Sequence, residues 1–183
     1  MPAVAWTVVI KMDVFQELAE DMRERLKDLT PVTKAAAEDL HIDVMLESFE
    51  TRTSPADKAW KPLQPETKRR KARQGFGTDP LVRRGDLKNR LAAEGKVDKV
   101  VFGISPTTPY GTYQQFGAKP RKAVSSQGKR KRRRARGTRK GIPARPFLPV
   151  DKSGVFVSKG RAGAWLKEFG SMVTNYVTTG KVD

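Results

Sequence analysis

The chain contains no cysteine, and this absence excludes several kinds of site at once. Disulfides, thiolate metal centres and cysteine nucleophiles all need a thiol. The sequence has one histidine, His41, so most zinc sites and catalytic triads are excluded as well. No apolar run approaches the ~20 residues of a membrane-spanning helix. The sequence therefore argues against a metalloenzyme and against a membrane protein.

Acidic residues are also scarce, since 20 Asp and Glu stand against 37 Lys and Arg, for a net charge of +17. None of the carboxylates forms a distinctive acidic motif. Asp39 and Asp43 flank His41 in a predicted helix, a spacing that is common on solvated faces. The glycine-rich pieces at 75–77 and 160–163 match no phosphate-binding loop. The sequence thus predicts no enzyme, no catalytic or metal-binding residue and no cofactor.

The excess positive charge is concentrated in one segment, 128–141, which reads GKRKRRRARGTRKG. Its nine cations are Lys129, Arg130, Lys131, Arg132, Arg133, Arg134, Arg136, Arg139 and Lys140. The wider span 119–140 holds twelve basic residues and no acidic one, so the rest of the chain carries only +5. A cluster this dense cannot be buried without partners. It must face water, an acidic protein surface or nucleic acid.

Three interpretations of the basic loop, 118–141, remain open on the pattern alone. It is a solvated, mobile insertion, a contact for nucleic acid, or a docking element for an acidic partner. Binding to phosphates would release counterions and would be salt-sensitive and blind to sequence. Because 119–140 contains no aromatic residue, stacking on single-stranded bases is disfavoured, and duplex backbone is the expected nucleic-acid target.

Helices are predicted where apolar residues recur every three or four positions. The expected ranges are 13–29, 30 to about 49, 66 to about 74, 85 to about 93, and a last helix from about 161. Thr30 is the expected N-cap of the second helix, with Pro31 at its first position. Gly85 and Asp86 are expected to cap the fourth.

Strands are predicted by alternation at 4–10 and by the run KVVFG at 99–103, with a weaker strand at 112–116 and a short one at 155–157. The Pro-rich segment 142–150, IPARPFLPV, is expected to be extended. The fold class is therefore α+β, a small antiparallel sheet packed with about four helices and interrupted by the long basic loop. We expect one domain over 1–183, with a C-terminal helical extension at 151–183.

Four sequence segments, in this order, resemble the phage virion morphogenesis family, the tail-completion and head–tail joining proteins of Mu-like phages. They are 60–63 (WKPL), 80–87 (PLVRRGDL), 100–103 (VVFG) followed by 110–117 (YGTYQQFG), and 142–148 (IPARPFL). The last segment is complete and is the most specific. One departure is Gln114, which stands where the family often has histidine.

The motif residues are expected to have structural roles. They are Trp60, Pro62, Leu63, Arg83, Gly85, Leu87, Gln115, Phe116, Gly117, Pro143, Arg145, Pro146, Phe147 and Leu148. Trp60 and Leu63 would anchor an irregular connection, and Gly85 and Gly117 would lie at turns or close approaches.

The prolines of IPARPFL, Pro143 and Pro146, would keep that segment extended while Phe147 and Leu148 pack inward. Arg145 is expected to pair with a carboxylate across a subunit boundary.

The resemblance implies a structural virion protein of the neck or tail end, which assembles as a ring around the DNA channel. Its partners would be further copies of itself and portal-side or tail-tube proteins, with no cofactor. The start of the chain, MPAVAWTVVIKMD, lacks the features of a signal peptide, so we expect the protein in the host cytoplasm during assembly and then in the virion.

In such a ring the basic loop would meet either DNA in the channel or an acidic partner. The partner is favoured, because nine cations per subunit would grip DNA that must leave quickly. The alternative function is a non-specific duplex nucleic-acid-binding protein that uses the loop.

Overall fold

The structure, a computed structural model, describes residues 12–108, 110–120 and 141–182. Its elements are α1 (Met12–Lys27), α2 (Thr30–Asp39), the π-helical η1 (Leu40–Leu46), α3 (Glu47–Thr51), α4 (Pro65–Arg73), the 3-10 turn η2 (Lys88–Arg90), β1 (Leu91–Lys96), β2 (Lys99–Ile104), α5 (Tyr110–Phe116) and α6 (Gly160–Thr179). The α+β class is confirmed. The strand expected at 4–10 lies outside the described residues.

One long helical rod is formed by α2, η1 and α3, which follow one another without a break. It begins as the sequence predicts, but Thr30 is its first helical residue and Leu29 is the N-cap. The expectation that Thr30 caps this helix was therefore wrong. The side chain of Asp28 lies just ahead, and its Oδ1 accepts the Thr30 N–H at 2.9 Å.

The helix expected from 85 to about 93 was wrong, because that stretch ends in strand β1. Leu87 and Leu91, on which the helical pattern rested, are both buried, but Leu91 begins the strand. β1 pairs antiparallel with β2, so that Leu91 faces Ile104 and Lys96 faces Lys99. A strand at 99–103 needs a partner for its backbone groups, and this requirement outweighs a weak local helical pattern.

The strand expected at 112–116 was also wrong, since this stretch belongs to helix α5. Gly111 and Gln115 are buried, whereas Tyr110 and Tyr113 are largely exposed. The buried pair lies four residues apart, which is a helical spacing. The short strand expected at 155–157 is reduced to one bridge, between Val150 and Phe156.

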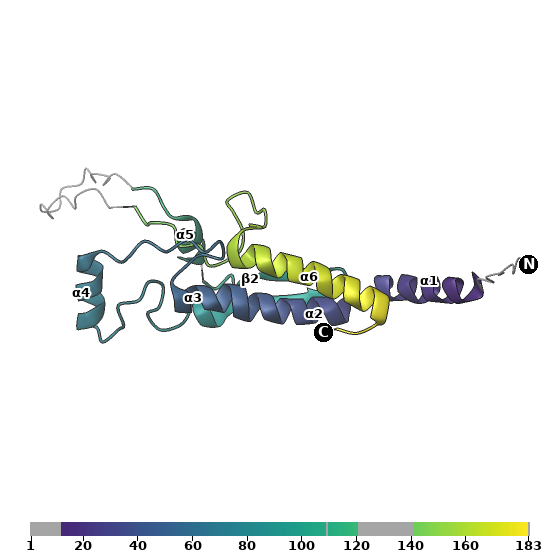
Figure 1. Ribbon diagram of the computed structural model, residues 1–183. Coiled ribbons are helices and arrows are strands. Elements are labelled where there is room, and N and C mark those ends of the chain that lie inside the picture. Colours follow the sequence, from purple (N-terminus) through teal and green to yellow (C-terminus); the bar gives the residue numbers. More distant parts are fainter. Residues whose placement is uncertain (1–11, 109, 121–140, 183) are drawn as a thin grey trace, which may run out of the picture.

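The core lies between the helical rod, the hairpin and α6, which crosses the rod (Figure 1). Its buried residues are Ala36, Leu40, Val44, Met45, Phe49, Trp60, Leu87, Leu91, Phe147, Ala162 and Trp165. Trp165 of α6 donates from Nε1 to the carbonyl of Ala36 at 2.9 Å. At Gly95 of β1, a Cβ would lie 2.3 Å from backbone atoms of α2, so the hairpin can approach the rod this closely only because glycine stands there.

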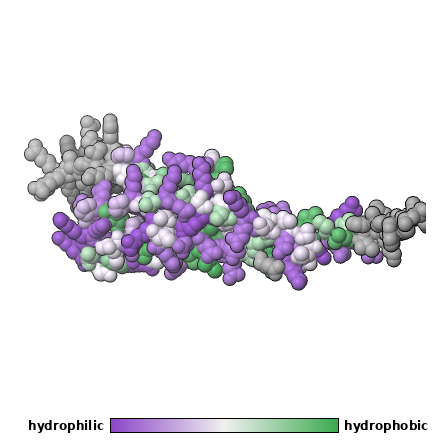
Figure 2. Space-filling model, in the orientation of Figure 1, coloured by the Kyte–Doolittle hydropathy of each residue, from purple (hydrophilic) through white to green (hydrophobic). Residues whose placement is uncertain are grey.

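The molecule is elongated, with α1 projecting from one end and α4 standing at the other (Figure 1). α1 is attached to the body through Arg25, whose Nη1 donates to the carbonyls of Val177 and Thr178 at 3.1 Å each. Leu18 and Leu26 of α1 remain 47% and 54% exposed. Figure 2 shows apolar side chains at the surface of this projecting helix and a mainly hydrophilic opposite end.

Candidate functional site

The sequence segments that resemble the phage family meet around one extended stretch, residues 142–150. Gln115 of α5, only 2% exposed, holds this stretch from one side. Its Oε1 accepts the N–H groups of Phe147 and Leu148 at 2.9 and 3.0 Å. Its Nε2 donates to the carbonyls of Leu148 and Val150 at 2.9 and 3.1 Å. The side chain thus uses its full hydrogen-bonding capacity on one piece of backbone.

The same stretch is held from the other side by Trp60 and Arg145. Trp60 donates from Nε1 to the carbonyl of Pro146 at 2.8 Å. Arg145 is 5% exposed and donates from Nε to the carbonyl of Lys61 at 2.9 Å and from Nη2 to that of Pro62 at 3.3 Å. Within the described residues Arg145 bonds to main-chain carbonyls, and its pairing with a carboxylate across a subunit boundary stays a prediction. Burial lowers the pKa of its guanidinium.

Gly117 allows the two segments to approach each other closely. Its φ is +75°, and a Cβ there would lie 2.8 Å from the carbonyl oxygen of Ile142 and 2.9 Å from the nitrogen of Ala144. Next to it, Ala118 and Ile142 exchange two backbone hydrogen bonds of 2.9 Å. Gly85 also has a positive φ, +81°, in the turn before η2.

The other motif residues divide between the core and its edge. Phe147 and Leu87 are fully buried in the core, and Leu148 packs against it. Leu63, Phe116, Pro143 and Pro146 are half-buried, whereas Pro62 and Arg83 are exposed.

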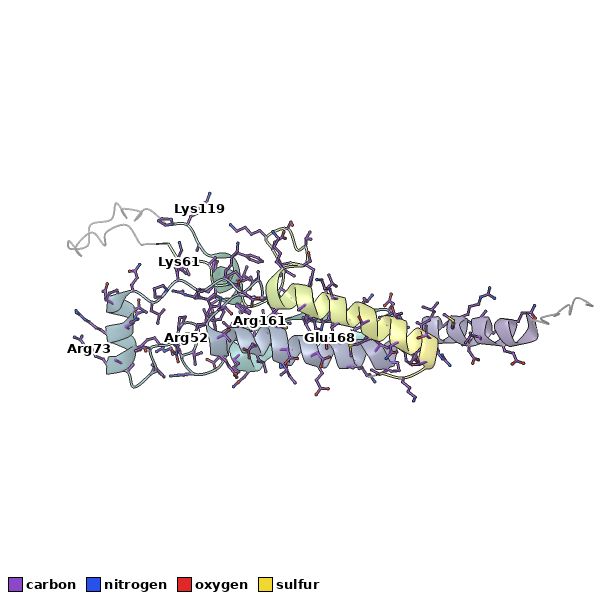
Figure 3. The ribbon with its side chains drawn as sticks, in the orientation of Figure 1. Arg52, Lys61, Arg73, Lys119, Arg161 and Glu168 are labelled. Atoms are coloured by element: carbon purple, nitrogen blue, oxygen red, sulfur yellow. The ribbon has the colours of Figure 1, made fainter. Side chains whose placement is uncertain are left out.

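A groove opens beside this junction, with a volume of about 1200 Å³. It is lined by α4, by the flanking stretches 61–64 and 81–87, by α5 and by 141–145. Its six cationic residues are Lys61, Arg70, Lys71, Arg83, Arg84 and Arg145, against a single acid, Asp86. Figure 3 shows Lys61, Arg73 and Lys119 toward the same end of the molecule.

Lys71 is the most deeply placed lysine of the groove, with 9% of its surface exposed. Its Nζ donates to the carbonyls of Asp79 and Val82 at 2.6 and 2.5 Å, and its burial lowers the pKa of the ammonium group. Arg83 stands over the ring of Phe76, with its guanidinium carbon 4.8 Å from the centroid. Among the described residues, none of the six cations forms a salt bridge. The groove therefore carries an excess of positive charge, which Asp86 and the nearby Asp79 offset only in part.

The wall of the groove is partly apolar. Tyr110 and Ile142 are 43% and 39% exposed there, and Leu63 and Leu81 are half-buried. The Oε1 atom of Gln114, also in the wall, is buried and accepts no hydrogen bond within the described residues. Cations, apolar side chains and an unused acceptor together make a surface suited to a polypeptide partner.

Sequence reasoning identified most of these residues as a motif but missed how they act. The burial of Lys71 was not among the expectations from the sequence. The spacing of Gly111 and Gln115 was the one signal that could have indicated the helix that aims Gln115 at 147–150. The nine basic residues of 129–140 lie outside the described residues.

The described residues hold no group of three or more His, Cys, Asp or Glu side chains that could bind a metal ion. None of the described helices is long and apolar enough to cross a membrane.

The model of the phage virion morphogenesis family matches residues 10–167, which is most of the chain. The chain belongs to the phage virion morphogenesis family. The resemblance found in the four segments is thereby confirmed, and the groove lies within the matched range. A phage virion morphogenesis protein has a structural role in the virion and interacts with other virion proteins. No curated protein matches the chain. No solved structure matches it either.

Proposed function

We propose that this virion protein completes the tail and joins it to the head, as a ring of subunits around the DNA channel. The observation that carries the proposal is the basic groove, where six cations face one acid. Lys61, Arg70, Arg83 and Arg84 are exposed, and none of the six cations has a salt-bridge partner among the described residues. An acidic surface on a neighbouring virion subunit would supply the opposite charge, and such complementarity gives an interface its specificity and orientation.

The described residues on either side of the basic segment lie at the groove. Ala118 and Gly141, which line the groove, are the described residues at the two ends of the basic loop. We therefore propose that the groove and the loop contact the same neighbouring subunit. The cations of the loop would then add to those of the groove.

The proposal is tested by the double substitution Arg83→Glu/Arg84→Glu in the phage. Both arginines are exposed and outside the core, so the subunit should fold. We expect electron micrographs of lysates to show full heads and tails that are not joined, with the infectious titre reduced by roughly a hundredfold or more. The matched control is Lys152→Glu/Lys181→Glu, which changes the charge equally at exposed positions outside the groove. Joined particles of normal titre in the Arg83/Arg84 variant would contradict the proposal.

The second candidate function is non-specific binding of duplex DNA, favoured by the nine cations of 129–140 and the net charge of +17. It predicts that purified protein binds duplex DNA of any sequence at low salt, with an affinity that falls steeply as salt rises. Absence of binding at about 50 mM salt would end this alternative, and the proposed joining role would be unaffected.

A further inference from the structure

We propose that α1 of one copy docks in the basic groove of the next copy, so that the subunits join head to tail. This inference rests on the proposed ring and names its interface. It follows from three features of the described chain. These are the exposed apolar face of α1, the negative charge of α1, and the match between α1 and the groove in character and size.

The first feature is that α1 lacks a cover. Leu18, Met22 and Leu26 recur every four residues and form one stripe along the helix. Leu18 and Leu26 are about half exposed, and the helix projects away from the body (Figure 1). An isolated helix of this length is marginal in water and owes its stability to packing of its apolar face. Packing of this stripe against a surface of another chain would therefore stabilise α1.

The second feature is the charge of α1, which is opposite to that of the remaining chain. Its sequence, MDVFQELAEDMRERLK, has five acids and three bases, in a chain of net charge +17. Arg25 is directed to the end of α6, and Lys27 pairs with Glu24. Glu17 and Glu20 are exposed and form no salt bridge among the described residues. These two carboxylates are available to a basic partner.

The third feature is that the groove matches this helix in character and size. Its apolar wall, with Tyr110 and Ile142, suits the leucine stripe, and its cations suit Glu17 and Glu20. A helix about 10 Å across occupies roughly 120 Å³ per residue of rise. The groove volume of about 1200 Å³ thus corresponds to about ten helical residues, the length from Glu17 to Leu26.

The donor helix and the groove lie at opposite ends of the elongated subunit (Figure 1). An interface between two different surfaces is heterologous, and it generates a closed ring or an open filament. A pairing of α1 with α1 would instead give only a dimer. The head-to-tail arrangement is therefore the one that is compatible with a ring.

The inference is tested with two charge-reversal variants of the whole chain. Glu17→Lys/Glu20→Lys damages α1 and leaves the groove intact, whereas Arg83→Glu/Arg84→Glu damages the groove and leaves α1 intact. By sedimentation velocity at low salt, we expect the wild type to form oligomers and each variant alone to be monomeric. We expect self-association to weaken about a hundredfold or more in each variant, because like charges then face each other. Circular dichroism checks that both variants fold.

An equimolar mixture of the two variants is the decisive sample. In the mixture the intact α1 of one variant meets the intact groove of the other, and the two reversed surfaces also carry opposite charges, so association should return. A mixture that stays monomeric overturns the inference. So does a groove variant that still dimerises while the α1 variant does not, because that result indicates pairing of α1 with α1. A wild type that remains monomeric at about 200 μM also overturns it, whereas the joining role is judged separately by the state of the particles.

Because the chain has no cysteine, introduced thiols provide a second readout. Glu20→Cys protein mixed with Arg84→Cys protein should give a disulfide-linked heterodimer under mild oxidation. The matched control pairs Glu20→Cys with Lys152→Cys, which lies outside the groove. Equal crosslinking in both mixtures would overturn the inference.

Discussion

The amide of Gln115 takes the place of a neighbouring strand for the extended segment 147–150. Its four hydrogen bonds to Phe147, Leu148 and Val150 are the bonds that a sheet would otherwise supply. This arrangement lets a Pro-rich segment cross the core without leaving its backbone groups unpaired. It also gives a physical reason why the QFG and IPARPFL segments occur together.

Replacing Gln115 by leucine should lower the free energy of unfolding by roughly 2–4 kcal/mol. The substitution keeps the volume but leaves the buried N–H of Phe147 unpaired, at about 1–3 kcal/mol, and the three partly buried groups add less because water reaches them. Urea denaturation measures the loss. The matched control is Gln114→Leu, one residue earlier, whose Oε1 accepts no hydrogen bond within the described chain, and which should cost less than about 1 kcal/mol. Equal losses in the two variants would contradict the role assigned to Gln115.

Replacing Gly117 by alanine should cost about 2 kcal/mol or more. The φ of +75° is unfavourable for alanine, and the new Cβ would collide with the backbone of residues 142 and 144. Gly77→Ala is the control, because nothing lies within 4 Å of a Cβ there, and we expect it to be neutral or slightly stabilising. Thermal melts of the two variants provide the comparison, and a Gly117→Ala protein as stable as wild type would contradict the close approach.

At the scale of elements, the long helical rod carries a group of acids where it faces α6. Burial raises the pKa of Asp39, and the neighbouring charges of Asp43, Glu168 and Glu38 raise it further. Because the folded pKa lies above the unfolded one, folding is favoured when this carboxyl is protonated. The contribution of Asp39 to the free energy of unfolding is fully present below its unfolded pKa, near 3.9. It is lost as the pH rises through the folded pKa of Asp39.

The substitution Asp39→Asn should therefore stabilise the protein at pH 7, by about 0.3–1 kcal/mol after allowance for solvent screening. Its advantage over the wild type should shrink as the pH is lowered toward about 4, where the aspartate is also protonated. Thermal melts between pH 4 and pH 7 measure this difference. Asp98→Asn, at the exposed hairpin turn and outside the acidic group, is the control and should give no such trend. An advantage that grows on acidification would contradict the assignment.

The elements that could be predicted from the sequence are the longer helices, which show a period, and β2, whose run of β-branched and aromatic residues is typical of a strand. Helices α1, α4 and α6, the rod and strand β2 were all expected close to their observed bounds. By contrast, β1 and α5 span only six and seven residues, and their type is decided by what they pack against. β1 forms because β2 needs a partner, and α5 forms because Gly111 and Gln115 both face the core. The groove was not predictable, because it arises only when four separate segments meet.

At the scale of the whole molecule, the basic loop is closed at its base by the pair Ala118–Ile142. Gly141 fits tightly there, since a Cβ would lie 2.5 Å from the carbonyl oxygen of Ala118. The fold on either side of the loop is thus joined by its own hydrogen bonds. Loop length should matter little to stability under these conditions.

Replacement of residues 121–140 by two glycines should therefore leave the free energy of unfolding within about 1 kcal/mol of wild type. The deletion removes eleven basic residues and no acid, so the net charge falls from +17 to +6. Chemical denaturation tests the stability, and binding of duplex DNA at about 50 mM salt tests the second candidate function. A deletion variant that unfolds would contradict the independence of the loop, and one that binds DNA as before would show that other cations are responsible.

The contact of Arg25 with the end of α6 has a consequence for the order of events during synthesis. Val177 follows Arg25 by 152 residues, so α1 is synthesised well before the end of α6. The carbonyls of Val177 and Thr178 that receive the guanidinium exist as a helix end only after α6 has been made. Until then α1 lacks the contact that fixes its direction. Under the proposed head-to-tail interface, a nascent subunit would therefore be unable to present α1 to a neighbour before α6 has formed.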